Sequence, residues 1–365
     1  MLPFLKKNKA ALTVAALDMV LFAAFQILKG RISLANFWTE RLTTPFKLLL
    51  ARLFAPLPIT AMELCYAALV LWLLFWLGKT VYLLIQAPSG RLRCLLRRLM
   101  QPVLTAATVA VCFSLLWGIN YYADGFQEKA GTHARGVAVT ELYDAARYFR
   151  VGLNAASAEV PRNEDGTLAA DAREILARSE DLYLPLLADY PFLSNDLVQP
   201  QPMVFSRICS YLGFTGVTFP FTGEACINVD VPVSSIPCTV AHELAHQQGF
   251  ASEQECNFLG ILACLESSDP LYRYSGWLSG YVHLSNALYK ADRELWKQLR
   301  EETDPNALAD LALRSAYWQQ FEGPVDTAAS KAYDSMLKGY GDSSGIQSYG
   351  TVTDLLVVYH QLYWK

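Results

Sequence analysis

Residues 239–257 read TVAHELAHQQGFASEQECN, and the rest of the chain is best understood from this segment outward. It places His242, Glu243 and His246 in the spacing His-Glu-x-x-His within a composition that favours a helix. Residues four apart lie on the same face of a helix, so both imidazoles can reach one metal ion while Glu243 projects beside them toward its water. The pattern predicts a zinc site in which Glu243 is the general base.

The same three residues can also meet by chance on an exposed helix, where polar pairs at this spacing are common. The neighbouring side chains decide between the two interpretations. Val240, Leu244 and Ala245 make the segment apolar enough to be buried. Buried histidines and glutamates need partners, so the metal site is the better interpretation.

A catalytic zinc needs a third protein ligand and an open position for water. Gly249 can end the first helix in a left-handed turn, and Ser252 with Glu255 matches a capping box that begins the next helix. Glu255 is then expected to fold back on its own helix terminus, which leaves Glu253 free as the third ligand. We expect Asn257, one turn later, to support Glu253. The alternatives for this ligand are Glu255, Glu224, Glu266 and His283.

Two further groups are expected around the metal. Hydrolysis needs a hydrogen-bond donor for the developing oxyanion, and among Tyr272, Tyr274 and His283 we favour Tyr274. Residues 216–224 (GVTFPFTGE) are candidates for a strand edge that pairs with an extended peptide. The alternative is a buried structural strand that ends at Pro220.

The N-terminal third differs sharply from the rest in hydropathy and charge. The chain has 365 residues, is 53% hydrophobic and has a mean hydropathy of +0.20. Residues 1–100 hold 13 basic side chains against three acidic ones, and the remainder is acidic. This division predicts a membrane anchor, residues 1–121, followed by one domain, residues 122–365. Three transmembrane helices are expected at about 11–28, 62–86 and 101–121.

Charge also predicts the topology and the partners. Arginines and one lysine cluster between the second and third spans, which places that loop in the cytoplasm and the domain outside the cytoplasmic membrane. The first loop is also basic, which favours the opposite orientation. The lipid bilayer is one expected partner, and the acidic rear domain makes nucleic acid an unsuitable one.

The rear domain is expected to be α+β and mostly helical. Amphipathic helices are predicted at 137–157 and 168–188, and short strands at MVFSRI (203–208) and GVTFPF (216–221). From residue 238 the pattern is helical, with breaks near Gly249, Pro270, Gly323 and Gly341. The eight cysteines form no closely spaced pair, so a thiolate zinc site is not expected.

Long stretches of the sequence resemble a bacterial membrane family, the domain-of-unknown-function family numbered 3810. The matching signatures are LPITAMEL (57–64), LLWGINYYADGF (115–126), the block 215–264 around the His-Glu-x-x-His segment, RYSGWL (273–278) and GIQSYGTVTDLLVVYH (345–360). The resemblance implies a metallopeptidase-like, zincin-like domain. The segment from Glu253 to Asn257 is also similar to the gluzincin helix in which a glutamate binds zinc, although Cys256 replaces the usual alanine.

Together these features predict a membrane-anchored zinc metallopeptidase that acts on a protein or peptide near the membrane surface. Two other functions fit the same residues. A membrane sensor or scaffold would use the metal only for stability, and a zinc hydrolase could act on cell-wall or lipid amides. A general base favours catalysis over a structural site, and an apolar pocket in place of a strand-edged cleft would favour the amide hydrolase.

Overall fold

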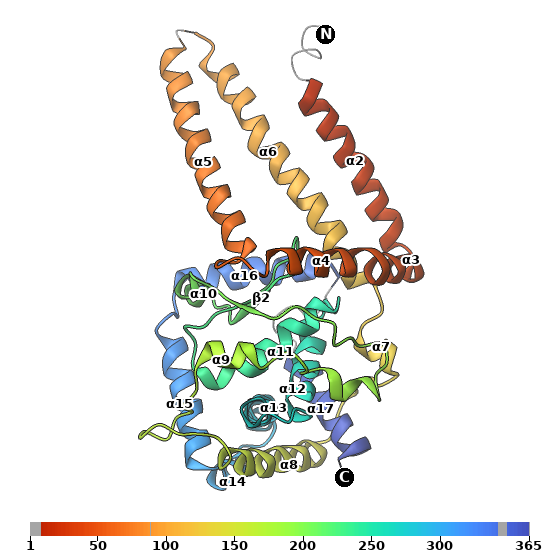
Figure 1. Ribbon diagram of the computed structural model, residues 1–365, viewed down its shortest axis with the longest axis vertical. Coiled ribbons are helices and arrows are strands. Elements are labelled where there is room, and N and C mark those ends of the chain that lie inside the picture. The colour runs from red at the N-terminus through yellow and green to blue at the C-terminus, as the bar shows by residue number, and fades with distance from the viewer. Residues whose placement is uncertain (1–8, 88, 342–348, 365) are drawn as a thin grey trace.

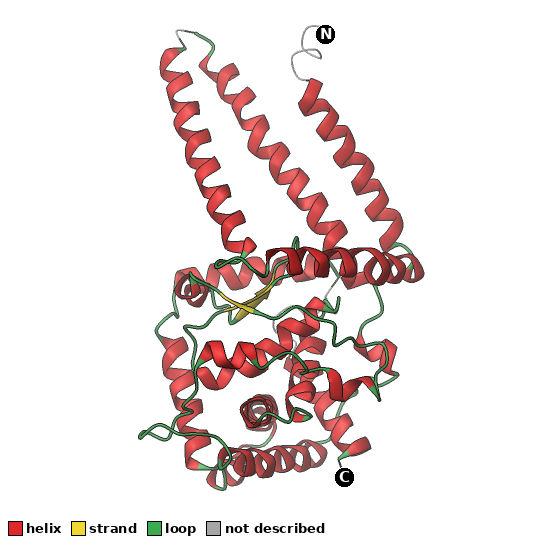
Figure 2. Ribbon diagram, viewed as in Figure 1, coloured by secondary structure: helices red, strands yellow, loops and turns green. Residues whose placement is uncertain are grey.

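The computed structural model describes residues 9–87, 89–341 and 349–364 and is mostly helical, as expected. Lys6, Lys7 and residues 345–348 of the C-terminal signature lie outside these ranges. Three long helices project from one side of a larger helical body that contains one small sheet (Figures 1 and 2). The described helices of the N-terminal third are α2 (Lys9–Lys29), α3 (Ile32–Trp38), α4 (Thr44–Phe54), α5 (Ala61–Gln86) and α6 (Arg91–Leu116), with a π-helical turn η1 (Thr39–Thr43) between α3 and α4.

The helices α2, α5 and α6 are long and apolar enough to cross a membrane, which confirms three candidate spans. The bounds of the third span differ from the expected 101–121, because α6 begins ten residues earlier and ends at Leu116. Pro102 lies inside α6 and has no N–H for the carbonyl of Arg98. The indole Nε1 of Trp76 in α5 donates to that carbonyl at 3.1 Å, so the helix continues through the proline.

Polar side chains within the spans bond to one another. Thr108 in α6 donates to the Asp18 carboxylate in α2 at 2.8 Å. The Arg98 Nε donates to the Thr80 hydroxyl in α5 at 3.0 Å. In an apolar environment these pairs satisfy groups that water would otherwise solvate.

The helices α3, η1 and α4 form one continuous helical segment, residues 32–54, that lies across the ends of the spans (Figure 1). This helix was not predicted from the sequence. Every fourth residue is buried against the rest of the molecule: Ala35, Thr39, Thr43, Lys47 and Ala51. The opposite face is exposed, so this segment has two distinct surfaces.

The body beneath the spans is built around the buried helix α13 (Pro270–Ala291), which appears end-on near the centre of Figure 1. Packed against it are α8 (Val139–Ser157), α11 (Ile236–Gln247), α12 (Glu253–Leu265) and α17 (Tyr349–Tyr363). The remaining helices and turns are η2 (Gly118–Tyr122), α7 (Phe126–Ala130), α9 (Ala172–Ala177), η3 (Leu184–Leu187), α10 (Ser206–Tyr211), η4 (Val233–Ser235), α14 (Arg293–Glu301), α15 (Pro305–Gln319) and α16 (Pro324–Gly339).

The expected helix breaks agree with these bounds. Gly249 separates α11 from α12, and Pro270 is the first residue of α13. Gly323 is the N-cap of α16, and Gly341 follows the end of that helix. Proline at a first helical position and glycine after a last one are local signals, and for that reason they could be recognised in the sequence.

The sheet consists of β1 (Gln201–Pro202), β2 (Gly216–Thr218) and β3 (Ala225–Ile227) in the order β1-β3-β2. β1 is parallel to β3, and β2 is antiparallel to β3 with Val217 opposite Cys226. The strand expected at 203–208 is wrong, because residues 206–211 form α10. Phe205 donates its main-chain N–H to Glu63 of α5 at 2.7 Å, which removes it from any strand ladder.

Candidate metal centre

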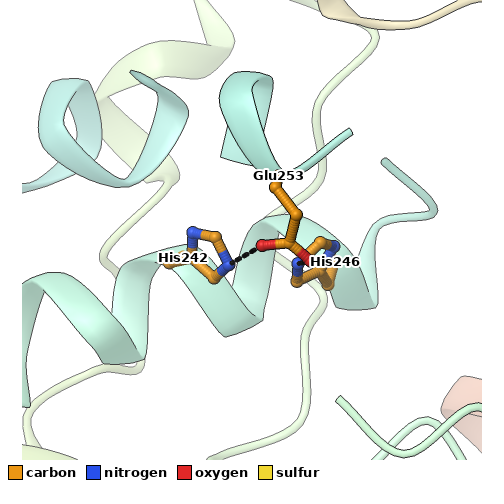
Figure 3. Close-up of side chains that lie close together, drawn as sticks. All are labelled: His242, His246 and Glu253. Atoms are coloured by element: carbon orange, nitrogen blue, oxygen red, sulfur yellow. Dashed lines mark ion pairs between the residues drawn. The ribbon is translucent and has the colours of Figure 1, made fainter. Parts of the chain in front are cut away.

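His242 and His246 lie one turn apart on α11, and Glu253 is the first residue of α12. The two imidazole centroids are 4.6 Å apart. The Glu253 carboxylate lies between the rings, with Oε2 at 3.2 Å from His242 Nε2 and Oε1 at 3.4 Å from His246 Nε2 (Figure 3). The structure therefore brings together the three side chains that the sequence predicted as ligands.

The connection between α11 and α12 has the predicted geometry. Gly249 has a φ of 100°, a conformation that favours glycine, and its N–H donates to the His246 carbonyl at 2.9 Å. Ser252 is the N-cap of α12, and its hydroxyl accepts from the Glu255 N–H at 3.5 Å. The tight turn returns the chain to the two histidines after only six residues.

Glu255 differs from its expected role of folding back on its own helix terminus. Its carboxylate accepts from the main-chain N–H groups of Phe126 at 2.8 Å and Gln127 at 3.1 Å, the first residues of α7. It therefore caps a helix more than 120 residues earlier in the chain. Burial raises the pKa of Glu255, although these hydrogen bonds oppose the shift. This engagement leaves Glu253 as the better third ligand.

The three side chains are close enough to share one metal ion, because one nitrogen or oxygen of each lies within 4.8 Å of the others. Ligands of a tetrahedral zinc at about 2.0–2.1 Å from the metal are roughly 3.3 Å apart, so small side-chain shifts would be needed to bring all three into that geometry. Two imidazoles and one carboxylate form a donor set typical of catalytic zinc.

Groups behind the ligands orient them. His246 Nδ1 lies 2.8 Å from the Phe250 carbonyl, which can only accept, so Nδ1 carries the proton and Nε2 is free to bind metal. Cys256 Sγ is 3.2 Å from the same nitrogen. Cys256 therefore supports His246, whereas the residue that we expected behind the ligands was Asn257, as a support of Glu253.

The charge state of Glu253 also suits a ligand. Burial by itself would raise its pKa, but the charge of His246 and hydrogen bonds from both histidines outweigh this effect. The pKa of Glu253 is therefore well below its usual value, and the carboxyl group is ionised.

Glu243 is buried beside the ligands and contacts β2. Thr218 Oγ1 lies 2.8 Å from Glu243 Oε2 and 2.9 Å from its main-chain oxygen, so the hydroxyl holds the carboxylate in place. Burial raises the pKa of Glu243, opposed by the nearby imidazoles and by the Thr218 hydrogen bond. A raised pKa moves a carboxylate toward the range in which a general base also returns its proton.

β2 forms an edge of the sheet directly beside Glu243. A β-carbon on Gly216 would meet Glu243 Oε1 at 2.6 Å, so only glycine allows this approach. Phe219 donates to Glu224 at 2.8 Å and Asn228 donates to Thr215 at 3.0 Å, so the odd-numbered residues face β3. The main-chain groups of Gly216 and Thr218 then point away from β3, toward the side of β2 on which no further strand of this sheet lies.

A tyrosine that the sequence analysis did not select reaches the site. The Tyr333 hydroxyl of α16 donates to Glu253 Oε1. Burial and then the charge of Glu253 raise the pKa of Tyr333 well above its usual value, so it remains a proton donor. No local pattern marks Tyr333, because it lies 80 residues from Glu253 and meets it only in the folded chain.

The tyrosines that were selected have other partners. Tyr274 donates its hydroxyl to Asp310, and Tyr272 donates to the Ile175 carbonyl at 2.9 Å. Both contacts are buried within the body of the domain. Tyr333 therefore replaces Tyr274 as our candidate for the oxyanion donor.

The other side chains considered as the third ligand either bond to other groups or lie outside the ligand group. Glu224 accepts from the Ala61 N–H at 2.9 Å and so caps the N-terminus of the α5 span. Glu266 is the exposed C-cap residue of α12. Desolvation lowers the pKa of His283 to about 4, and this histidine is not part of the ligand group that the described residues form.

Residues of the anchor contribute to the surroundings of the metal centre. Trp117, just after α6, meets His246 edge-on with ring centroids 5.5 Å apart. A β-carbon on Gly249 would lie 2.9 Å from Thr44 Oγ1 of α4. The site is thus built from both sides of the expected boundary at 121/122.

Comparison with known proteins gives one match. No curated protein and no solved structure matches the chain. The model of a family described as Protein of unknown function (DUF3810) matches residues 39–357, a range that includes η1 and α4 of the helical segment over the site and both helices that hold the candidate ligands. Because this match covers most of its length, the chain belongs to the DUF3810 family.

Proposed function

We propose that this protein is a membrane-anchored zinc metallopeptidase in which His242, His246 and Glu253 hold the metal. Zinc bound there would act as a Lewis acid toward a peptide carbonyl and toward water. Glu243 accepts a proton from the attacking water and passes it to the amine leaving group. The Tyr333 hydroxyl donates a hydrogen bond to the developing oxyanion once substrate displaces it from Glu253.

The observation that carries this proposal is the position of Glu243. It lies on the same helix as the two histidines, is held by Thr218, and is separate from the three-residue ligand group. A structural zinc site has four protein ligands and no use for a neighbouring base. Three ligands with an ionisable carboxylate beside them are the arrangement that hydrolysis requires.

The position of β2 beside Glu243 favours a peptide substrate over a small amide. An extended peptide can add to the side of β2 away from β3, at Gly216 and Thr218, through main-chain hydrogen bonds, with its carbonyl close to Glu243. This is the strand-edged arrangement expected of a peptidase. It gives affinity without demanding a particular side-chain sequence.

The charge distribution supports a domain outside the cytoplasmic membrane. The α5–α6 connection and the first turns of α6 carry Arg91, Arg93, Arg97 and Arg98, at the far end of the spans from the domain (Figure 1). Cations near short loops favour the cytoplasmic side. We therefore place the peptidase domain on the opposite, extracytoplasmic side.

The test uses the full-length protein in detergent or nanodiscs, because residues before 122 pack on the site. Bound zinc is measured by elemental analysis, and cleavage of a peptide library is measured by mass spectrometry. We expect Glu243→Gln to keep zinc and to lower kcat by about 10²–10⁴-fold. Glu253→Ala should lose zinc and activity together.

Glu266→Gln is the matched control, because this exposed carboxylate ends the same helix that begins with Glu253. It should change neither zinc content nor cleavage. A protein that binds zinc but cleaves no peptide, or a Glu243→Gln variant with full activity, would contradict the proposal and favour a metal-stabilised sensor or scaffold.

A further inference from the structure

The outer face of the 32–54 helical segment carries large apolar side chains that no other described part of the molecule covers. Phe37 is 57% exposed, Phe46 47% and Leu49 62%. Monomeric soluble proteins rarely expose many large apolar side chains so close together. The full set of large exposed apolar residues on this face is Ile32, Phe37, Leu42, Phe46, Leu49 and Leu53.

A second exposed apolar group lies far away in sequence but close to a span. Val204, Phe205, Ile208 and Tyr211 of the β1–α10 region all have exposed side chains. The Phe205 N–H donates to Glu63 Oε1 in the first turn of α5. This hydrogen bond fixes the second group at the level where the α5 span begins.

The orientation of the 32–54 segment identifies what covers it. The segment runs across the ends of α2, α5 and α6, not parallel to them (Figure 1). Arg31, Arg41 and Arg52 lie among its apolar residues, with exposed side chains. An apolar face flanked by cations, next to membrane spans, is typical of a helix that lies in the plane of the membrane interface.

The inner face of the same segment contacts the metal centre. Thr44 and Thr39 approach Gly249, at the turn between the ligand helices. Lys47 is 2% exposed, and its ammonium group lies 4.5 Å from the ring of Trp117, which in turn contacts His246. The segment is therefore a thin layer with lipid-compatible residues on one side and the metal centre on the other.

We infer that the 32–54 segment and residues 204–211 lie in the lipid leaflet and hold the metal centre directly beneath it, so that the substrates are polypeptide segments close to where they leave the bilayer. The position in the leaflet follows from the exposed faces and does not require activity. The substrate class rests on the proposed peptidase function.

The position in the leaflet is tested by photo-crosslinking in nanodiscs, without any assay of activity. p-Benzoylphenylalanine replaces Phe37 or Phe46 in the full-length protein, and adducts are identified by mass spectrometry. Replacement of Phe75, 67% exposed within α5, is the positive control, and replacement of Val151, 58% exposed on α8 at the far end of the domain, is the negative control (Figure 1).

Lipid adducts at Phe37 and Phe46 comparable to those at Phe75, with none at Val151, are the expected result. Lipid adducts at Phe75 alone would overturn the inference. Adducts that join Phe46 to a second copy of the chain would also overturn it, because they would show a protein interface on this face.

The substrate class is tested with one peptide sequence presented in two ways, free in solution and attached to a transmembrane anchor in the same nanodisc. Leu49→Glu on the outer face should lower cleavage of the anchored form by about tenfold and leave the free form unchanged, because the anchored peptide loses its effective concentration at the site. Equal losses for both forms would overturn this part. If wild type cleaves neither form while the crosslinks appear, the peptidase proposal fails and the position in the leaflet stands.

Discussion

One buried and one half-buried carboxylate in this protein each accept a hydrogen bond from a tyrosine, and their surroundings differ in the cation that they face. Asp310 accepts from Tyr274 and Glu253 accepts from Tyr333. Asp310 also has a permanent cation, whereas Glu253 has only the two imidazoles of the ligand helix. The comparison separates a carboxylate that is paired with an arginine from one that is paired only with histidines.

The Asp310 carboxylate is paired with an arginine. Arg162 Nη1 donates to Oδ2 at 2.6 Å, and the Leu168 N–H donates to Oδ1 at 2.9 Å. The Arg162 guanidinium also lies 4.5 Å from the ring of Tyr274. The Asp310 carboxylate has both a counter-charge and donors for its two oxygens, although Arg162 Nε has no hydrogen-bond partner among the described residues. This group joins α13, α15 and the loop after α8.

The Glu253 group has no permanent cation among the described residues. In the metal-free protein the charge of His246 and hydrogen bonds from both histidines compensate the Glu253 carboxylate. Histidines that bind a metal are neutral, so the bound cation would take over this role. His242 Nδ1 is buried without a hydrogen-bond partner among the described residues, which shows that this ring is not fully supported by protein groups.

The largest difference is expected when each carboxylate is neutralised. Asp310→Asn leaves Arg162 buried without its counter-charge and should reduce the free energy of unfolding by about 3–5 kcal/mol, with zinc content unchanged. Glu253→Gln should abolish zinc binding, and it should also destabilise the metal-free protein, because His246 loses the carboxylate that pairs with it. Thermal unfolding in detergent and elemental analysis measure both effects.

Glu302→Gln is the control for the first substitution, because Glu302 pairs with Arg150 but its side chain is 64% exposed. Its effect should not exceed about 1 kcal/mol. Equal destabilisation by Asp310→Asn and Glu302→Gln would remove the proposed difference between a buried and a surface ion pair.

The two tyrosines sharpen the comparison at a smaller magnitude. Tyr274→Phe should cost about 1–3 kcal/mol of stability, because Asp310 loses a buried donor, and should leave kcat intact. Tyr333→Phe should leave stability nearly unchanged and lower kcat by about 10²-fold, because the oxyanion loses its donor. Steady-state kinetics and thermal unfolding of the two variants test both predictions. A loss of kcat in Tyr274→Phe alone would return the catalytic assignment to Tyr274.

Lys47 is the reverse case, a buried cation without a carboxylate partner. Its substitution is expected to have the smallest effect on stability. Its ammonium group has no hydrogen-bond partner among the described residues, and burial lowers its pKa from 10.5 to about 7. Between these values the unfolded chain binds more protons than the folded one, so stability rises with pH from about 7 to 10.5 and is lowest below pH 7. Lys47→Met should remove this rise, giving the variant a melting temperature a few degrees higher at pH 6. Parallel wild-type and variant profiles between pH 6 and 9 would exclude burial of a charged Lys47.

Much of the metal centre could be predicted because its information is local. The two histidines and Glu243 depend on helical spacing, and the return to Glu253 depends on Gly249 and Ser252, all within twelve residues. The expected roles that differ are those that depend on distant partners. Glu255 caps α7, Tyr333 arrives from α16, and Phe205 leaves its expected strand to bond Glu63.

The sequence by itself determined the three candidate spans, the helical character of the domain and the grouping of His242, His246 and Glu253, because hydropathy, helix periodicity and capping act over one or two turns of chain. Only the tertiary structure decided which carboxylates already bond to other protein groups and which tyrosine reaches the site. It also decided that a helix between two spans covers the candidate metal centre. Such contacts join residues 80 or more positions apart, and their formation depends on the packing of whole helices, which no short pattern encodes.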